Sequence, residues 1–309
     1  MSSNRKMKFI IALYPYSWRE GGTTAMHYFS KMLCDMGEEV YITTLNKDYI
    51  DNPFTDTTLA MPGNNSKTIN ARVASILAQE DDVVTIYPEV EPGNPLNAKK
   101  VVRWVLYYPG GHSKGDTTFD SSEYVFAYSD RFVKGTIYES SPLLSIIQTR
   151  TNQFFDMNLE RKYDCILVKK SVRMNFHQIK ANHYEPYKHL LDKPLISLDQ
   201  ILDQLTRIED LNLIFNKVRY FVSFDHATYH NFLASLSGCT SIVLPMDGVS
   251  KEQFVKDMPL YQYGVAYGFE DVKWANQTRG KMRAQLEKTE EQNTVFIKNF
   301  LNLVSEKWY

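Results

Sequence analysis

SFDHATYHNFLASLSGCTSIVLP, residues 223–245, predicts the end of a strand, a helix and a second strand in direct succession. Aromatic and β-branched residues mark 219–224 and 240–245 as strands, and the apolar residues between them recur at helical spacing. Successive strand, helix and strand segments form βαβ units, which build parallel sheets. Asp225 would then follow the first strand, at the edge where open parallel sheets bind ligands.

The same alternation of strands and helices continues in two series, separated by a stretch without periodicity around 140–162. Residues from 270 onward have helical spacing only. Further strands are expected at 8–15, 38–45, 81–90, 122–130, 163–171 and 194–199. The expected fold class is α/β, with two Rossmann-like domains facing across a cleft and a long C-terminal helix. We assign the N-terminal domain to 1–150 and the C-terminal domain to 151–309.

Length and composition limit the classes of protein to consider. The chain has 309 residues, which suits two domains, and its formal net charge of -1 argues against a dedicated nucleic-acid partner. Cys34, Cys165 and Cys239 have no CxxC spacing, which disfavours a zinc site and favours a reducing, cytoplasmic location. No apolar stretch approaches the ~20 residues of a membrane span, so we expect no transmembrane segment.

Three residues of the N-terminal half are candidates for a catalytic base. His112 lies in the glycine-rich stretch YYPGGHSKGD, and a histidine pKa near neutrality suits proton transfer. An ordinary loop histidine is the alternative. Glu89 and Asp130 each follow an expected strand and are alternative bases.

Glycines mark two loops that could approach a ligand. Gly21, Gly22 and Thr23 lie between the first strand and a helix expected at about 23–36, and Gly110 and Gly111 precede His112. Glycine lets a backbone come close to a ligand, although a plain turn uses it equally well. The GxGxxG pattern is absent, so the sequence does not indicate a dinucleotide site.

The combination of several segments resembles the GT-B glycosyltransferases, in particular bacterial and large-virus glycan-synthesis enzymes. The segments are YPYSWREGGTTAMHYFSKMLCDMGEEV (14–40), GNPLNAKKVVRWVLYYPGG (93–111), FDHATYHNFLASLSGCTSIVLP (224–245) and YQYGVAYGFEDVKWANQT (261–278). The resemblance implies two Rossmann-like domains, with the nucleotide-sugar donor in the C-terminal one and the acceptor mainly in the N-terminal one.

The resemblance also implies a transfer of sugar from a UDP- or GDP-linked donor to a glycan or other hydroxyl acceptor. Backbone N–H groups at the start of the helix after Asp225 would suit a diphosphate. Many relatives carry a ribose-binding Glu at the position of Leu233, so the donor site departs from the pattern here. The implied donor-binding residues are Lys169, Lys170, Arg173, Asp225, His226, Thr228 and Tyr229.

The three basic residues of that set would neutralise the leaving diphosphate, because charge builds on the leaving oxygen; a solvated strand end is the alternative. We expect no cofactor and no metal ion. His226 and His230 are four residues apart and would share a helix face, but HExxH and a third ligand are absent. Two other functions stay open: a catalytically degenerate binding or partner subunit, and a sugar-nucleotide epimerase.

Overall fold

The computed structural model describes residues 7–45, 60–111, 118–168, 176–226 and 228–309. The chain divides into two units, and each is described by itself. Unit 1 consists of Met1–Gln148 together with Glu290–Tyr309, and unit 2 consists of Thr149–Thr289.

Unit 1 is built on a six-stranded sheet in which neighbouring strands are parallel. Its order, β3-β2-β1-β4-β5-β6, is that of the Rossmann sheet. The central strands are buried on both faces, as expected where helices and loops cover a parallel sheet. The strands are β1 (Lys8–Ala12), β2 (Glu39–Thr43), β3 (Lys67–Thr68), β4 (Val83–Pro88), β5 (Val101–Val105) and β6 (Tyr124–Ala127).

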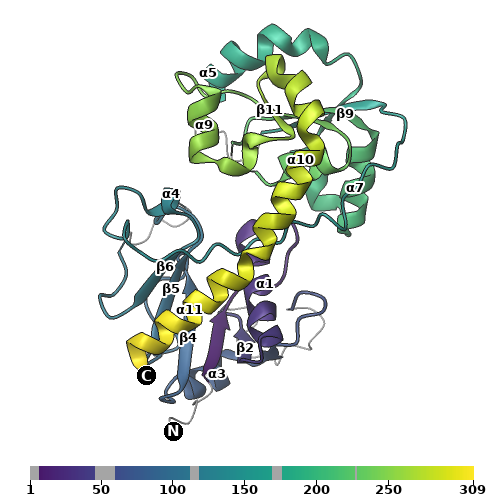
Figure 1. Ribbon diagram of the computed structural model, residues 1–309. Helices are drawn as coiled ribbons and strands as arrows, with labels where there is room; N and C mark the ends of the chain where they lie inside the picture. The colour runs from purple at the N-terminus through teal and green to yellow at the C-terminus, as the bar shows by residue number, and fades with distance from the viewer. Residues whose placement is uncertain (1–6, 46–59, 112–117, 169–175, 227) are drawn as a thin grey trace. The chain divides into compact units, whose positions relative to one another are not determined.

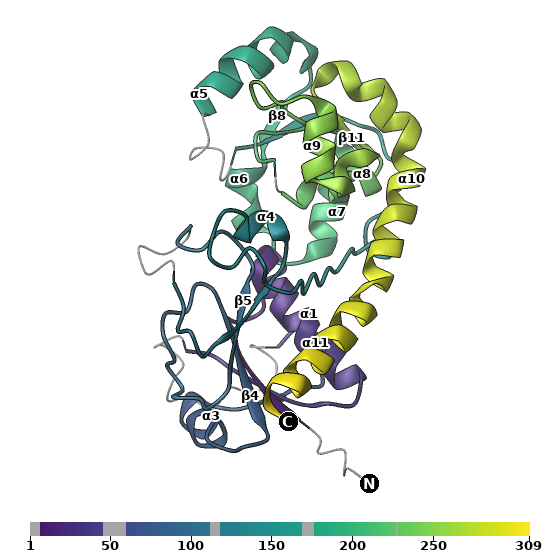
Figure 2. The same cartoon turned by 60° about the vertical axis from the view of Figure 1, so that its left-hand side comes forward.

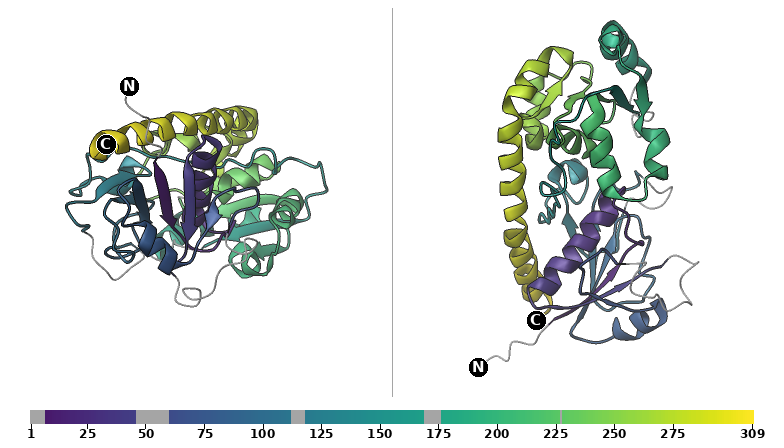
Figure 3. Two further views of the ribbon diagram at one scale, coloured as in Figure 1. Left: turned by 90° about the horizontal axis from the view of Figure 1, so that it is seen from below. Right: turned by 90° about the vertical axis from the view of Figure 1, so that its right-hand side faces the viewer.

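Helices α1 (Gly21–Asp35) and α11 (Asn293–Trp308) lie side by side over one face of this sheet (Figures 1 and 3). Their fully buried Phe29 and Phe300 belong to the same apolar core. The other face packs on α3 (Ala71–Leu77). A short helix, α4 (Asp130–Val133), follows β6.

Unit 2 contains a five-stranded parallel sheet of order β11-β10-β9-β7-β8, which is the flavodoxin-like order read from the opposite edge. Its strands are β7 (Tyr163–Leu167), β8 (Leu195–Ser197), β9 (Val218–Ser223), β10 (Thr240–Val243) and β11 (Val265–Tyr267). The helices that surround it (Figure 2) are α5 (Phe176–Ile179), α6 (Leu198–Ile201), α7 (Ile208–Lys217), α8 (His230–Leu236), α9 (Lys251–Asp257) and α10 (Val272–Glu291).

The two parallel Rossmann-like sheets predicted from the sequence are confirmed. The segment 93–111, one of those that carry the resemblance, contains β5. The helical region after 270 is divided at Gln292 into α10 and α11. Among the described residues, no helix has the length and apolar character needed to cross a membrane.

The division into units differs from the predicted 1–150 and 151–309 at the end of the chain. Residues Glu290–Tyr309 belong to unit 1, because Ile297, Phe300 and Val304 of α11 are buried in the core of its sheet. Asn293 ties this segment to the chain leaving unit 1, since its side chain accepts a hydrogen bond from the Ile147 N–H (3.0 Å) and donates one to the Ile147 carbonyl (2.7 Å).

A fragment of residues 1–150 is therefore expected not to fold, because without α11 the apolar face around Phe29 would meet water. Circular dichroism and thermal unfolding would measure this. A matched fragment that joins 1–148 to 290–309 through a short Gly/Ser linker is expected to unfold cooperatively, since Ile147 and Asn293 are hydrogen-bonded neighbours. Equal stability of the two fragments would contradict the division described here.

Candidate functional site

The topological switch point of the first sheet lies between β1 and β4, where the strand order reverses. Open α/β sheets bind ligands beyond the carboxyl ends of strands at such a point. Glu89 directly follows β4 and so lies at this position. The sequence placed Glu89 at a strand end as an alternative base, and the topology gives that strand end its significance.

Glu89 is buried, and its environment changes its acidity. The backbone N–H of Leu106 donates a hydrogen bond of 2.9 Å to Oε2 of Glu89. Burial raises the pKa of the Glu89 carboxyl to about 7, although this hydrogen bond and the Arg103 charge act in the opposite direction. A carboxyl with such a pKa exchanges its proton near neutral pH, which is the property of a general base or acid.

The glycines after β1 do not form the predicted loop. Gly21, Gly22 and Thr23 are the first residues of α1, whose N-cap is Glu20. The first helical hydrogen bond runs from the Thr24 N–H to the Glu20 carbonyl (2.9 Å), so the helix begins before its expected start at about residue 23. A Cβ on Gly22 would lie 3.7 Å from the Leu106 side chain, which is an ordinary contact.

The start of α1 thus approaches Leu106, the residue whose N–H holds Glu89. The loop between β1 and α1 is fixed by a histidine that sequence reasoning did not single out. His27 of α1 is fully buried and donates its Nε2–H to the Tyr14 carbonyl at 2.9 Å. Burial lowers the pKa of His27 to about 4, so it stays neutral and structural.

The second glycine loop, at Gly110 and Gly111, is a tight turn that is closed by a hydrogen bond within it. The Gly111 N–H donates to the Tyr108 carbonyl at 2.8 Å, and Gly110 between them has a φ of +75°. Pro109 followed by a glycine of positive φ is the sequence of a type II turn. A Cβ on Gly111 would come within 2.9 Å of the Tyr108 carbonyl. Both glycines are required by the turn itself, and His112 lies outside the described residues.

Asp130, the third candidate base, has a local structural role. It is exposed at the first position of α4, where its carboxylate accepts the Arg131 N–H at 2.7 Å. The Ser129 hydroxyl donates to the same oxygen at 3.3 Å. These contacts to its chain neighbours are those of a helix-start residue, so Glu89 is the better-supported base of the two.

The switch point of the second sheet lies between β7 and β9. After β7 the Val168 N–H donates to Oδ2 of Asp199 at 2.7 Å. Three predicted diphosphate ligands come next in the chain and lie outside the described residues: Lys169, Lys170 and Arg173. Their role stays a prediction.

Asp225 and His226 follow β9 at this switch point, as predicted, and both are buried. The Asp225 N–H donates to Oγ of Ser223 (3.1 Å), and the Ser223 hydroxyl donates to the Asp225 carbonyl (2.9 Å). Nε2 of His226 bonds the Leu244 carbonyl at 2.8 Å, which joins this loop to the end of β10. The strand end that carries Asp225 is therefore rigidly held.

Thr228 and Tyr229 precede α8, whose first residue is His230, so their predicted place at the helix start is confirmed. Oγ1 of Thr228 lies 2.9 Å from Nδ1 of His230. The Thr228 carbonyl accepts a hydrogen bond of 3.1 Å from the hydroxyl of buried Tyr261, which Asn231 in turn contacts at 3.1 Å. These buried hydrogen bonds fix the backbone just before α8, in the predicted donor-binding segment.

One expectation about this helix is corrected. His226 and His230 do not share a helix face, because His226 lies in the loop before α8 and bonds the Leu244 carbonyl. Leu233, at the position of the implied ribose-binding Glu, is a buried apolar residue of α8. Within the described ranges, no three His, Cys, Asp or Glu side chains gather closely enough to hold a metal ion.

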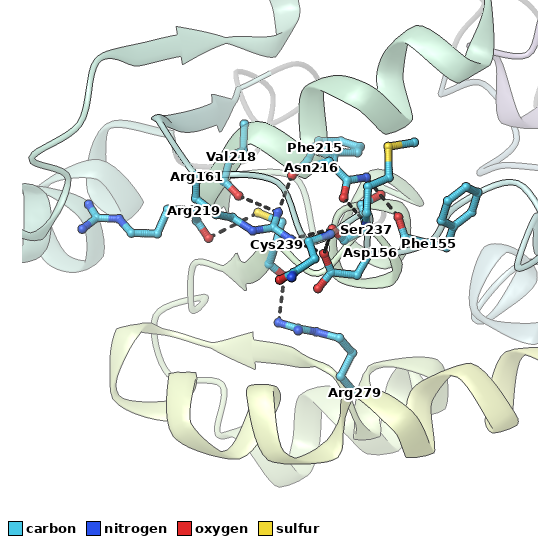
Figure 4. Close-up of polar contacts among 12 residues, drawn as sticks. Phe155, Asp156, Arg161, Phe215, Asn216, Val218, Arg219, Ser237, Cys239 and Arg279 are labelled. Carbon is cyan, nitrogen blue, oxygen red and sulfur yellow. Dashed lines mark hydrogen bonds and ion pairs between the residues drawn. The ribbon is translucent and has the colours of Figure 1, made fainter.

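The turn at Gly238 and Cys239 connects α8 to β10, at the edge of the sheet opposite to the one that carries Asp225. Packing within unit 2 determines its conformation. Gly238 has a φ of +80°, and a Cβ there would overlap the carboxylate of Asp156. Figure 4 shows the cluster around this turn: Arg161 bonds Asp156 at 2.9 Å and the Ser237 carbonyl at 2.9 Å. Arg279 donates to the Cys239 carbonyl at 3.3 Å. The turn is thus part of a packed cluster and not of the ligand edge.

Comparison with known proteins identifies the fold. No protein-family model matches the chain, and no curated protein matches its sequence. An alpha-glucosyltransferase in complex with UDP and a 13-mer DNA containing an HMU base aligns with a TM-score of 0.55 and 12% identity over 97% of this chain and 100% of that one. An alpha-glucosyltransferase with UDP and a 13-mer DNA containing a central A:G mismatch gives 0.51 and 12% over 97% and 99%.

The chain has the GT-B fold. The alignments span nearly the whole length of both chains, so the resemblance includes both units and the C-terminal helices. This confirms the fold that the sequence segments implied. At 12% identity the likeness concerns the fold alone.

The same comparison corrects one expectation about partners. The nearly neutral net charge predicted that the chain has no nucleic-acid partner. That exclusion is wrong as a rule for this fold, since the alpha-glucosyltransferase with the TM-score of 0.55 is bound to DNA. Net charge describes the whole chain and carries no information about a local binding surface.

Burial of Glu89 has a measurable effect on stability. Its folded pKa of about 7 exceeds the ordinary value of 4.5, so the folded state holds the proton more tightly and stability falls as pH rises from 4.5 to 7. Glu89→Gln keeps an acceptor for the Leu106 N–H without the charge. We expect it to raise the free energy of unfolding at pH 8 by on the order of 2–3 kcal/mol, and by much less near pH 4.

Urea unfolding at the two pH values measures this difference. Asp130→Asn is the matched control, because Asp130 is exposed and its substitution is expected to give no such dependence. An effect of Glu89→Gln that is equal at both pH values would show that the carboxyl titrates normally.

Proposed function

We propose that this protein is a glycosyltransferase that moves a sugar from a nucleoside-diphosphate sugar to a hydroxyl acceptor. Unit 2 binds the donor, and unit 1 binds the acceptor and supplies the base. The observation that carries the proposal is Glu89, a buried carboxyl with a pKa near neutrality at the switch point of the first sheet. The GT-B fold shared with UDP-bound alpha-glucosyltransferases supports it.

In the proposed reaction the Glu89 carboxylate accepts the proton of the acceptor hydroxyl. The acceptor oxygen forms a bond to the anomeric carbon of the donor, and the bond from that carbon to the diphosphate breaks. The nucleoside diphosphate leaves with the electron pair, and Glu89 holds the proton until solvent removes it. A single displacement of this kind inverts the anomeric centre.

The donor is UDP- or GDP-linked in this proposal. The loop after β9 supplies its ligands, because Asp225 and the backbone before α8 are held in fixed positions. Basic residues at 169, 170 and 173 would stabilise the charge on the leaving diphosphate. The proposal includes neither a metal ion nor another cofactor, as predicted from the sequence. It also retains the cytoplasmic location, consistent with three unpaired cysteines.

The acceptor is a glycan or another molecule with a free hydroxyl, and DNA belongs among the acceptors to be tested. DNA is included because it is bound in the alpha-glucosyltransferase structure reported above. A second candidate function is nucleotide binding without transfer. It is favoured by Leu233, an apolar buried residue where the resemblance implies a ribose-binding carboxylate.

Nucleotide binding is the first testable consequence. We expect UDP or GDP to raise the midpoint of thermal unfolding, because a ligand at 100 times its Kd adds about 2.7 kcal/mol. Asp225→Asn is expected to weaken the shift, whereas Asp130→Asn in unit 1 leaves it unchanged. A panel that also includes ADP, CMP and dTDP identifies the nucleobase that the donor site prefers. Stabilisation by none of these nucleotides would contradict both the transferase function and nucleotide binding without transfer, and would favour a partner subunit.

Loss of the base should affect the transfer step and not donor binding. Glu89→Gln is expected to lower kcat by about 10²–10⁴-fold while the thermal shift with nucleotide persists. Asp130→Asn is the control that should keep full activity. Radiolabelled sugar transfer gives the rate, and NMR of the product gives its anomeric configuration. Full activity of Glu89→Gln, or a retained configuration, would rule out Glu89 as the base.

A further inference from the structure

The segment between β4 and β5 carries Glu89 without the support of a helix. Residues 89–100 contain turns and bends, and no helix connects the two parallel strands there. Backbone carbonyls in such a segment have no regular partners, and buried ones need other donors. The Glu89 N–H itself donates to the Trp104 carbonyl at 3.1 Å. The contacts that hold the carbonyls on either side of Glu89 contribute the rest of its positioning.

Arg103 of β5 supplies those donors. Its side chain is fully buried, and Nη1 donates to the carbonyls of Pro88 (3.2 Å) and Glu91, while Nη2 donates to that of Gly93 (2.6 Å). The guanidinium thus binds the backbone before Glu89 and after it. It lies 5.1 Å from the ring centroids of both Tyr87 and Phe119, which limit its movement.

Glu123 completes the arrangement. Its buried carboxylate accepts hydrogen bonds from Nε (2.8 Å) and Nη2 (2.9 Å) of Arg103. Together with the three carbonyls, this accounts for all five N–H donors of the guanidinium. Arg103 and Glu123 line the same pocket as Glu89. Because the two form an ion pair, together they add no net charge to that pocket.

The absence of net charge matters for a base. An unpaired Arg103 would favour the ionised form of Glu89 and make it a weaker proton acceptor. The other described charges of the pocket are Lys99 and Asp120, which are exposed. Glu91, two residues from Glu89, accepts a hydrogen bond of 2.6 Å from the Tyr14 hydroxyl. Glu123 is therefore the group placed to cancel the buried cation.

We infer that Arg103 and Glu123 act together as positioning residues for Glu89, holding the backbone on both sides of it while adding no net charge beside it. This inference rests on the proposed function. A buried ion pair contributes little stability compared with a well-packed apolar pair. Selection for stability alone would not require a pair with this geometry, and positioning of Glu89 explains both the carbonyl contacts and the matched charges.

The test compares two substitutions with different electrostatic effects. Glu123→Gln leaves Arg103 charged and unmatched, so the apparent pKa on the acidic limb of the kcat/KM profile should fall by about one unit. Arg103→Lys keeps the charge but loses the fork that binds three carbonyls. It should lower kcat by about 10²-fold with little change in that pKa, because loss of the carbonyl contacts moves Glu89 away from the position that suits proton transfer.

Asp120→Asn is the matched control, since Asp120 is exposed in the loop that also carries Glu123 and lines the same pocket. It should leave both the profile and kcat unchanged. If the pair had only a structural role, each substitution would instead change the rate by the same factor at every pH. An unshifted profile in Glu123→Gln, or an unchanged kcat in Arg103→Lys, would overturn the inference; if one variant fails to fold, the other decides.

A second readout separates this inference from the proposed function. The Glu89 carboxyl can be titrated by carbon-13 NMR in the full chain, with its signal assigned by its loss in Glu89→Gln. In Glu123→Gln the pKa of Glu89 is expected to fall by about one unit, whether or not the protein transfers sugar. Absence of transfer by the wild-type chain would reject the proposed function, whereas an unshifted titration would reject the role of the pair.

Discussion

Neighbouring strands are parallel in both sheets, and this constraint decides where chemistry can gather. Parallel strands end at a common edge, and the order of the strands reverses once in each sheet. Glu89 lies at that reversal in unit 1, and Asp225 lies at it in unit 2. Residues at the opposite edge, such as Gly238, serve packing instead.

One arginine in each unit has a similar structural role. Arg103 binds the carbonyls of the irregular segment after β4, and Arg161 donates to the carbonyls of Phe215 (2.8 Å) and Val218 (3.0 Å) where α7 meets β9. The guanidinium has five donors in a rigid plane, so one side chain satisfies several backbone groups that regular secondary structure leaves unpaired. Each arginine also has an acidic partner, Glu123 or Asp156.

Local sequence predicted the elements well where the hydrophobic period was long or uniform, as in β1, β4 and α10. It did not predict β11 or α9. Only Phe254 of α9 is buried, so its seven residues show no apolar period, whereas α8 has the same length but six buried residues. Glu89 was identified only by its place after a strand, since its burial depends on segments distant in the chain. Gly21 looked like a loop residue because glycine favours turns, yet it begins a helix.

Membership of α11 in unit 1 has a consequence for synthesis. Unit 2 is continuous in sequence, so all its residues leave the ribosome before the final helix does. Unit 1 starts first but finishes last, because Phe300 is needed in its core. The nascent chain must therefore hold an apolar sheet face without its partner while unit 2 is made, which is a period when chaperones have a binding site.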